Sequence, residues 1–329
     1  MSANLSVNKE GEVNFAYTGE KPWHKSGIEV PATMSVMEGL TFSRNTWDVD
    51  KHPMTCITNE GVVDVPDHFA VVRSDTQNIL GVVGNRYECV SNVEAFSFFD
   101  MVLGQNNAQI ETVGALGLGE RVFMIAKLPQ ISEIVKGDIV EKYLLVSTSH
   151  NGSTGIEILF TDVRVVCANT LSVALRNTQN KLKIRHSKNW ESKMKESERT
   201  IRESQKYWNE IELASKHLAS TSVDRVIVGD FLEKMFPKAE DAKTKTQDNK
   251  REKVLELVES GMGTEIQGVR GTAWGLYNAY TEYLDHHTSV HGIEKDDRQG
   301  LMSKRWENSN FSNTVIAKRQ TAFDYLVNL

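Results

Sequence analysis

One pair of strand-like segments constrains the fold of this chain more than any other feature. Residues 143–149 (YLLVSTS) and 156–166 are rich in β-forming side chains, and apolar residues alternate along the second segment. The tetrapeptide HNGS at 150–153 separates them and is a strong turn signal, because Asn-Gly readily adopts the positive φ angles of tight hairpins. The central part of the chain is therefore predicted to fold as a β-hairpin.

Several flanking segments extend this β-rich region. Residues 69–73 and 79–83 read as a second hairpin, and residues 121–128 as a further strand before the central pair. A helix is predicted at 168–177, so the order along the chain is strand, strand, strand, helix. Residues 1–60 carry several turn signals and are interpreted as a wrapping region, not an independent domain.

A helical pattern begins near Lys188. Five apolar residues follow at spacings of seven, seven, three and seven, which predicts one apolar seam on a long charged helix. The seam residues are Met194, Ile201, Trp208, Ile211 and Leu218. Such a seam favours a homo-oligomer, although a helix that packs on its own chain has the same pattern.

The remaining C-terminal sequence contains one charged stretch and two further helices. Residues 239–253 (AEDAKTKTQDNKREK) are nearly free of apolar side chains and are predicted to form a loop, whereas 271–287 and 314–327 read as helices. The fold class is thus α+β, with an antiparallel β-rich core and a mostly helical C-terminal region. The predicted divisions are 1–60, 61–178 and 179–329.

Positive charge is concentrated in one segment of an acidic chain. The net charge is −6, but residues 176–202 contain nine Lys or Arg and three Glu. This segment therefore carries +6 and the rest of the chain −12. A localised positive field of this kind can attract a polyanion despite the unfavourable total charge.

Alternation within this segment defines the leading candidate site. Lys181, Lys183 and Arg185 would share one face of a strand, a row that matches a phosphate backbone. Trp190 or His186 can stack on a base. An edge strand protected by lysines gives the same pattern. The predicted nucleic-acid-binding residues are Arg164, Arg176, Lys181, Lys183, Arg185, Lys188 and Trp190.

No residues stand out as catalytic or metal-binding. Cys167 lies among apolar neighbours and is interpreted as a packed thiol, and lone histidines such as His150 have no assignable partner. Glu282 and His286 have an i, i+4 spacing that permits metal ligation, and Asp285 would lie near them. A hydrogen-bonded core helix explains these residues better, so we expect neither a metal nor a cofactor.

Five segments together resemble an uncharacterised phage/plasmid-like protein family, a domain of unknown function common in phages, plasmids and prophages. They are residues 22–24 (PWH), 72–90 (VRSDTQNILGVVGNRYECV), 149–153 (SHNGS), 164–171 (RVVCANTL) and 271–287 (GTAWGLYNAYTEYLDHH). The resemblance implies a mobile-element origin and brings no known activity or catalytic residues.

A looser resemblance concerns the order of elements. Three strands and a helix followed by a basic segment are similar to the core of single-strand annealing proteins, which form rings or filaments along DNA. The leading hypothesis is therefore a protein that binds or anneals single-stranded DNA, with RNA as a second ligand, in recombination or replication. An inhibitor or modulator of a host protein and a metal-dependent nuclease are the alternatives.

Targeting signals are absent from the sequence as given. The first residues contain no apolar run suited to a signal peptide, and no segment approaches the roughly 18 apolar residues of a membrane helix. The three cysteines, Cys56, Cys89 and Cys167, are far apart and lack CxxC spacing. A cytoplasmic protein without a membrane partner is expected.

Overall fold

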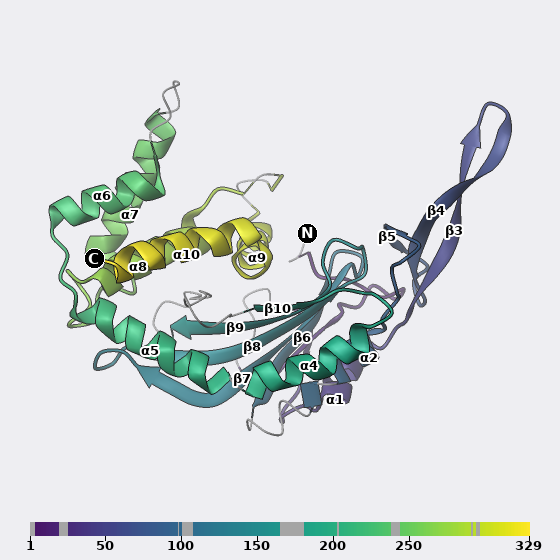
Figure 1. The fold of residues 1–329 in the computed structure, drawn as a ribbon, viewed down its shortest axis with the longest axis horizontal. Coiled ribbons are helices and arrows are strands. Elements are labelled where there is room, and N and C mark those ends of the chain that lie inside the picture. Colours follow the sequence, from purple (N-terminus) through teal and green to yellow (C-terminus); the bar gives the residue numbers. More distant parts are fainter. Residues whose placement is uncertain are drawn as a thin grey trace. The chain divides into compact units, whose positions relative to one another are not determined.

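Two β-sheets and a set of C-terminal helices form the α+β fold that the sequence predicts (Figure 1). The computed structural model describes residues 4–19, 26–97, 99–100, 108–164, 181–202, 204–237, 244–290, 292–293 and 297–329. No helix in this part of the chain combines the length and the apolar character that a membrane span requires.

The larger sheet has seven strands in the order β10-β9-β8-β7-β6-β1-β2. Its strands are β1 (Phe15–Tyr17), β2 (Ile28–Glu29), β6 (Gln109–Leu116), β7 (Arg121–Glu133), β8 (Ile139–Ser149), β9 (Ile156–Arg164) and β10 (Lys181–Ile184). Strands β6 and β7 pair in antiparallel fashion, as do β9 and β10. The sheet is mixed because β1 and β2 are parallel. The predicted hairpin at 143–166 corresponds to β8 and β9, which are neighbours in this sheet.

The smaller sheet has the order β3-β4-β5 and is antiparallel. Its strands are β3 (Val49–Thr58), β4 (Gly61–Arg73) and β5 (Ile79–Gly84). The pairing of β4 with β5 confirms the predicted hairpin of residues 69–83. Strand β3 was not predicted, because it lies in residues 1–60, which were interpreted as a wrapping region, and its mostly exposed side chains lack apolar alternation.

The chain folds into two compact units that are interleaved along the sequence. Unit 1 contains Met1–Pro129, Tyr143–Leu159 and Lys181–Glu203, and unit 2 contains Gln130–Lys142, Phe160–Asn180 and Ser204–Leu329. Strands β7, β8 and β9 each pass from one unit into the other, so neither unit is a continuous stretch of chain.

The core of unit 1 forms where two short helices meet the large sheet. These helices are α1 (Val36–Phe42) and α2 (Asn92–Ser97). Ser35 begins α1 with a capping box, because its hydroxyl accepts from the Glu38 main chain while the Glu38 carboxylate accepts from Ser35. On the sheet, Gly114 leaves room for the Phe15 and Phe123 rings, which would lie 2.6 and 2.9 Å from a Cβ at that position.

Helices dominate unit 2, as predicted for the C-terminal region. They are α5 (Ser204–Ser220), α6 (Arg225–Met235), α7 (Thr244–Ser260), α8 (Ala273–Glu282), the π-helix η1 (Tyr283–His287), α9 (Arg298–Phe311) and α10 (Asn313–Val327). Their core is aromatic, with Trp208, Trp274, Tyr277 and Phe323 almost fully buried. The Trp274 indole donates to the Asp138 carboxylate at 2.7 Å, which joins α8 to the turn before β8.

The whole described part of the predicted loop at 239–253 is helical instead. Residues 244–253 begin helix α7, so that prediction was wrong. Lys, Gln, Glu and Arg are good helix formers, and buried Val254 and Leu257 anchor the later turns of α7. Residues 238–243 lie outside the described part of the chain.

The predicted apolar seam lies on α4 (Trp190–Arg202) and α5 rather than on one element. Its described side chains, Met194, Trp208, Ile211 and Leu218, are all buried within the chain. They therefore offer no exposed face to a partner. The homo-oligomer stays a prediction, and the seam is no longer a reason for it.

Candidate nucleic-acid interface

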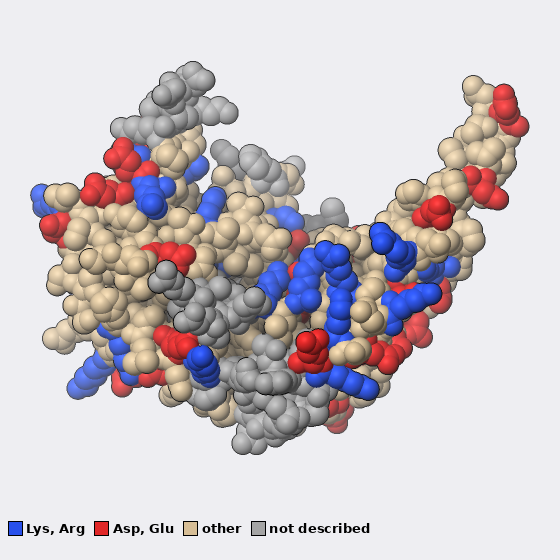
Figure 2. All heavy atoms as spheres, viewed as in Figure 1, with Lys and Arg blue, Asp and Glu red and all other residues tan. Residues whose placement is uncertain are grey.

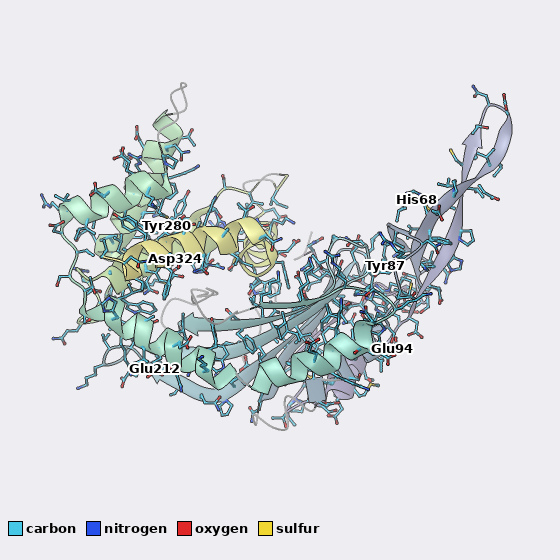
Figure 3. All side chains as sticks on the ribbon, in the orientation of Figure 1. His68, Tyr87, Glu94, Glu212, Tyr280 and Asp324 are labelled. Carbon is cyan, nitrogen blue, oxygen red and sulfur yellow. The ribbon has the colours of Figure 1, made fainter. Side chains whose placement is uncertain are left out.

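A cavity of about 860 Å³ opens on unit 1 and collects residues from four distant parts of the chain. Asp67 and His68 come from β4, residues 84–87 are the end of β5 and the turn after it, and residues 152–155 belong to the turn between β8 and β9. The last group comes from β10 to α4: Lys183, Arg185, His186, Ser187 and Lys193. Figure 3 shows His68 and Tyr87 near the root of the β3–β4 hairpin.

The cavity lining is strongly cationic. Arg86, Lys183, Arg185 and Lys193 are exposed, and Asp67 is the only carboxylate among the described lining residues. The lining therefore carries a formal charge of +3 before histidines are considered. Figure 2 shows Lys and Arg side chains gathering on unit 1 near the root of the β3–β4 hairpin. Such a surface favours an anionic ligand.

One buried carboxylate organises the cations of β10. Glu157 lies opposite Lys183 in the β9–β10 register, and its side chain is 6% exposed. Its oxygens lie 3.1 Å from the Lys181 Nζ, 3.7 Å from the Lys183 Nζ and 3.9 Å from the Arg121 Nη1. Three cations thus share one carboxylate, and the cluster keeps a net positive charge.

The turn between β8 and β9 is shaped by close packing on its neighbours. Gly152 has a φ of +75°, and a Cβ on Gly155 would lie 2.0 Å from the Ile184 carbonyl oxygen. The Asn151 side chain accepts from the Ser149 hydroxyl at 2.7 Å and from the Ser153 main chain at 2.9 Å. These interactions fix the turn against β10 and place Ser153 in the cavity wall.

Two buried histidines belong to this region: His186 lines the cavity, and the His150 ring lies edge-on to it with centroids 6.4 Å apart. His186 stacks on Tyr87 with ring centroids 5.0 Å apart, and its Nε2 lies 3.1 Å from the Thr148 hydroxyl. Burial lowers the pKa of His186 to about 4, although the main chain of Glu88 acts in the opposite direction. Burial and the charges of His186 and Arg73 lower the pKa of His150 to about 3. Both rings are therefore neutral near pH 7.

Tyr87 gives the cavity an aromatic surface of fixed orientation. Its hydroxyl donates to the Ser149 carbonyl at 3.2 Å, while one ring face is backed by His186. Burial raises the pKa of the Tyr87 phenol, so it stays protonated and remains a donor. A ring held in this way can stack on a flat ligand with little loss of side-chain entropy.

A buried cation lies in the same unit as the cavity. The Arg73 guanidinium is fully buried, pairs with Asp75 at 2.6 Å and lies over the Trp47 ring at 4.4 Å. Trp47 in turn packs edge-on against His150, whose Nε2 lies 2.8 Å from the Asn92 amide oxygen. These interactions link β4, α2 and the turn after β8, and His150 connects them to His186 of the cavity lining, with ring centroids 6.4 Å apart.

The residues predicted to bind nucleic acid are placed unevenly around this cavity. Lys181 and Lys183 share one strand face, and both Lys183 and Arg185 line the cavity. Lys181, Lys188 and Trp190 are not among the described lining residues. The side chain of Arg164 and the whole of Arg176 lie outside the described part of the chain, as do Cys167 and the predicted helix at 168–177.

Arg86, Lys193 and Tyr87 were not predicted as site residues. Arg86 and Tyr87 lie far from β10 in the sequence, and Lys193 lies beyond the alternating cations of residues 181–185. Only folding brings the three residues to the same cavity. The segment 72–90 did contain a signal, because it carries part of the family resemblance together with the sequence Asn-Arg-Tyr after a strand.

The carboxylates of the predicted C-terminal helix serve hydrogen bonds within unit 2. Asp285 accepts from Ser309 at 2.9 Å and also pairs with Arg319. Glu282 accepts from the main chain of Met262 at 3.4 Å and of Gly263 at 3.5 Å. Among the described residues, no group of three or more His, Cys, Asp or Glu side chains is placed to hold a metal ion.

Fold and cavity together define an α+β protein with a cationic cavity. The chain belongs to the family described as domain of unknown function DUF932, whose model matches residues 79–311. The matched region includes Arg86, Lys183, Arg185 and Lys193, and thus all cations of the described cavity lining. No curated protein and no solved structure matches the chain.

Proposed function

We propose that this protein binds single-stranded nucleic acid, with DNA as the first candidate, in the cationic cavity of unit 1. The observation that carries the proposal is the convergence on one cavity of four exposed cations from two separate parts of the chain, residues 84–87 and residues 183–193. The phosphodiester backbone of a nucleic acid is a common polyanion that would bind such a surface. Its binding to Lys and Arg releases condensed counterions.

Two features favour a single strand over a duplex. The cavity is a local hollow with one tyrosine ring in its lining, and Tyr87 stacked on His186 offers a surface for an unpaired base. Bases in a duplex are already stacked and cannot use such a ring. Tyr87 thereby takes the role that the sequence suggested for Trp190.

Annealing of complementary strands in recombination or replication is the wider role that we propose, in a protein encoded by a phage or plasmid. The order of β-strands before a basic segment supports it, as does the family resemblance. The nuclease alternative has less support in this cavity, since Asp67 is the only carboxylate among its described lining residues. Hydrolysis assisted by two metals uses several carboxylates.

Fluorescence anisotropy with a labelled oligothymidylate at several salt concentrations tests the proposal. If the four lining cations bind phosphates, log K should fall with log salt at a slope of about −0.7 for each bound phosphate, or near −3 in total. The Arg86→Gln, Lys183→Gln, Arg185→Gln, Lys193→Gln variant should lose most of this slope. Its melting temperature should change little, because exposed charges contribute little stability.

A matched variant controls for the loss of four charges. Lys206, Lys216, Arg225 and Lys234 are exposed cations on helices of unit 2, and their replacement by Gln should leave affinity and slope nearly unchanged. Absence of salt-dependent affinity in the parent protein contradicts the proposal. Equal losses in the two quadruple variants contradict its assignment to the cavity.

A further inference from the structure

The outer part of the β3–β4 hairpin, residues 54–65, forms a projecting ribbon that we call the arm (Figure 1). The register changes at its root, where Pro53 pairs with Phe69 but Met54 pairs with Val65. Three residues of β4 are thereby left over as a bulge, and Asp67 within it has a φ of +58°. Such a bulge bends a strand and redirects the ribbon beyond it.

The arm exposes apolar side chains that have no core of their own. Ile57 is 85% exposed and Val62 66% exposed, and Val63 is also exposed. A two-stranded ribbon is marginally stable in water when nothing covers it. Apolar side chains gathered on a projecting ribbon are typical of a surface that binds another macromolecule.

The charge of the arm indicates which class of partner it suits. Residues 54–65 contain Glu60 and Asp64 and no Lys or Arg. An acidic ribbon is repelled by a phosphate backbone and by an anionic membrane surface. A protein surface that combines apolar side chains with nearby cations is the complement that fits.

The outer edge of β5 has these properties. Both β3 and β5 are edge strands of the three-stranded sheet, and no described strand pairs with their outer sides. Ile79 is 61% and Val82 50% exposed on β5. The strand ends at Gly84 beside Arg86, in the wall of the cationic cavity. Exposed edges recruit further strands through main-chain hydrogen bonds.

We propose that the arm of one copy docks on the outer edge of β5 in a second copy. The interface joins two different surfaces, so each copy can both give and receive an arm. Repetition of this heterologous interface generates a ring or an open filament. The proposal rests on the arm and on β5, and it holds or fails independently of nucleic-acid binding.

Sedimentation velocity over a range of micromolar concentrations tests the interface. The parent protein should show species larger than the 37.0 kDa chain. The Ile57→Asp, Val62→Asp variant should need at least about tenfold more protein to assemble, the shift that about 1.4 kcal/mol produces. Ile79→Asp on the receiving edge should have the same effect. Because this substitution leaves the arm unchanged, it shows that the interface is lost and not that the arm is misfolded.

Leu213 provides the matched control, because it is 69% exposed on α5, away from both surfaces in the sequence. Leu213→Asp should assemble as the parent does. A parent that remains at 37.0 kDa at every concentration overturns the proposal. So does an arm variant that assembles as readily as the control.

Disulfide cross-linking then locates the two surfaces. The exposed thiol of Cys56 lies on the arm, so a Cys89→Ser, Cys167→Ser background leaves it as the sole native thiol. Adding Ile79→Cys should yield covalent dimers and larger species on oxidation, whereas adding Leu213→Cys should not. Across the three-stranded sheet, Ile79 lies level with a β3 residue that is six positions from Cys56, a separation of roughly 20 Å along the strand. The two thiols therefore cannot join within one copy. Equal cross-linking of the two variants refutes the proposed receiving edge.

Discussion

Glu157 limits how much of the positive charge on β10 is available to a ligand. Its carboxylate is shared by Lys181, Lys183 and Arg121, and it is nearly buried. A phosphate that binds the two lysines must therefore compete with this carboxylate. In the proposed function, Glu157 would therefore weaken polyanion binding while it keeps three like charges close together.

Replacement of Glu157 by Gln should therefore strengthen nucleic-acid binding. The neutral amide keeps the shape of the side chain but frees the lysines, so the salt slope should steepen by about 0.7 for each additional phosphate bound. Anisotropy measurements with oligothymidylate check this result. The protein should also become less stable, since three cations lose their shared partner.

Glu212 offers a control of similar chemistry. It accepts from Lys216 and from Ser132, each at 2.6 Å, and Lys216 is the main cause of its lowered pKa. Glu212→Gln in unit 2 should leave the salt slope unchanged. A Glu157→Gln variant with weaker binding than the parent would show that the carboxylate orders β10 rather than competing with phosphate.

His186 and His150 make stability depend on pH. Burial lowers their pKa values to about 4 and about 3 from the ordinary value of 6.5. Between pH 6.5 and about 4 the unfolded chain binds protons at these positions, whereas the folded chain does not. The free energy of unfolding therefore falls as pH falls through this window. Each histidine lowers it by at most about 1.4 kcal/mol per pH unit.

Urea unfolding at about pH 7.5, 6.0 and 5.0 measures this dependence. The contribution of the two histidines should be flat above about pH 7 and should fall below about pH 6.5. His186→Gln cannot take up a proton, so its stability should decline less steeply with acid than that of the parent. An identical pH dependence in both proteins contradicts the assignment to His186.

At the scale of elements, a buried ion pair joins the last helices of unit 2. Arg319 of α10 pairs with Asp285 of η1, and both side chains are almost fully buried. The Arg319 Nη1 also donates to the Ser309 carbonyl of α9 at 2.8 Å. One guanidinium thus connects three elements that follow each other along the chain.

Arg319→Met should destabilise the protein by about 3–5 kcal/mol, because it leaves the Asp285 carboxylate buried without its cation. Adding Asp285→Asn should recover much of this loss, since the uncompensated charge disappears. Urea unfolding of the single and double variants measures both effects. The exposed pair Lys253–Glu256 is the control, and Lys253→Met should cost no more than about 1 kcal/mol. Full additivity of the two buried substitutions would contradict a coupled pair.

Elements with strong local signals were predictable from the sequence. Strands β8 and β9 have alternation and an Asn-Gly turn, β4 and β5 have β-branched runs, and α10 has helical periodicity. Strand β1 has three residues and is held by pairing with β6, about a hundred residues away. Helix α7 begins with charged turns and lacks an apolar period there. These elements depend on tertiary interactions, which a local pattern does not contain.

The candidate site divides in the same way. The alternation of Lys181 and Lys183 on one face was readable because a strand places every second residue on the same side. The partnership of these lysines with Glu157 was not, since it depends on the register between β10 and β9. Arg86 and Tyr87 reach the cavity through the turn after β5, and their proximity to β10 arises only in the folded unit.

At the scale of the whole molecule, the chain combines a net charge of −6 with a cationic cavity and an acidic arm. If arms link copies and cavities bind single strands, neighbouring copies can share one strand. Binding to a long strand is then strengthened by the arms as well as by the phosphates. Binding to a strand short enough for one copy is strengthened by the phosphates only.

We therefore expect cooperative binding to long oligothymidylate and simple binding to a short one. The Ile57→Asp, Val62→Asp variant should lose the cooperativity on the long strand and keep the affinity of the parent for the short strand, because its cavity is unchanged. The Lys183→Gln, Arg185→Gln variant should weaken binding to both strands while assembly without nucleic acid persists. Anisotropy titrations on the two lengths, with sedimentation of the free proteins, distinguish these effects. An arm variant that retains full cooperativity would separate assembly from strand binding, and a loss of affinity for the short strand would show that the arm touches nucleic acid.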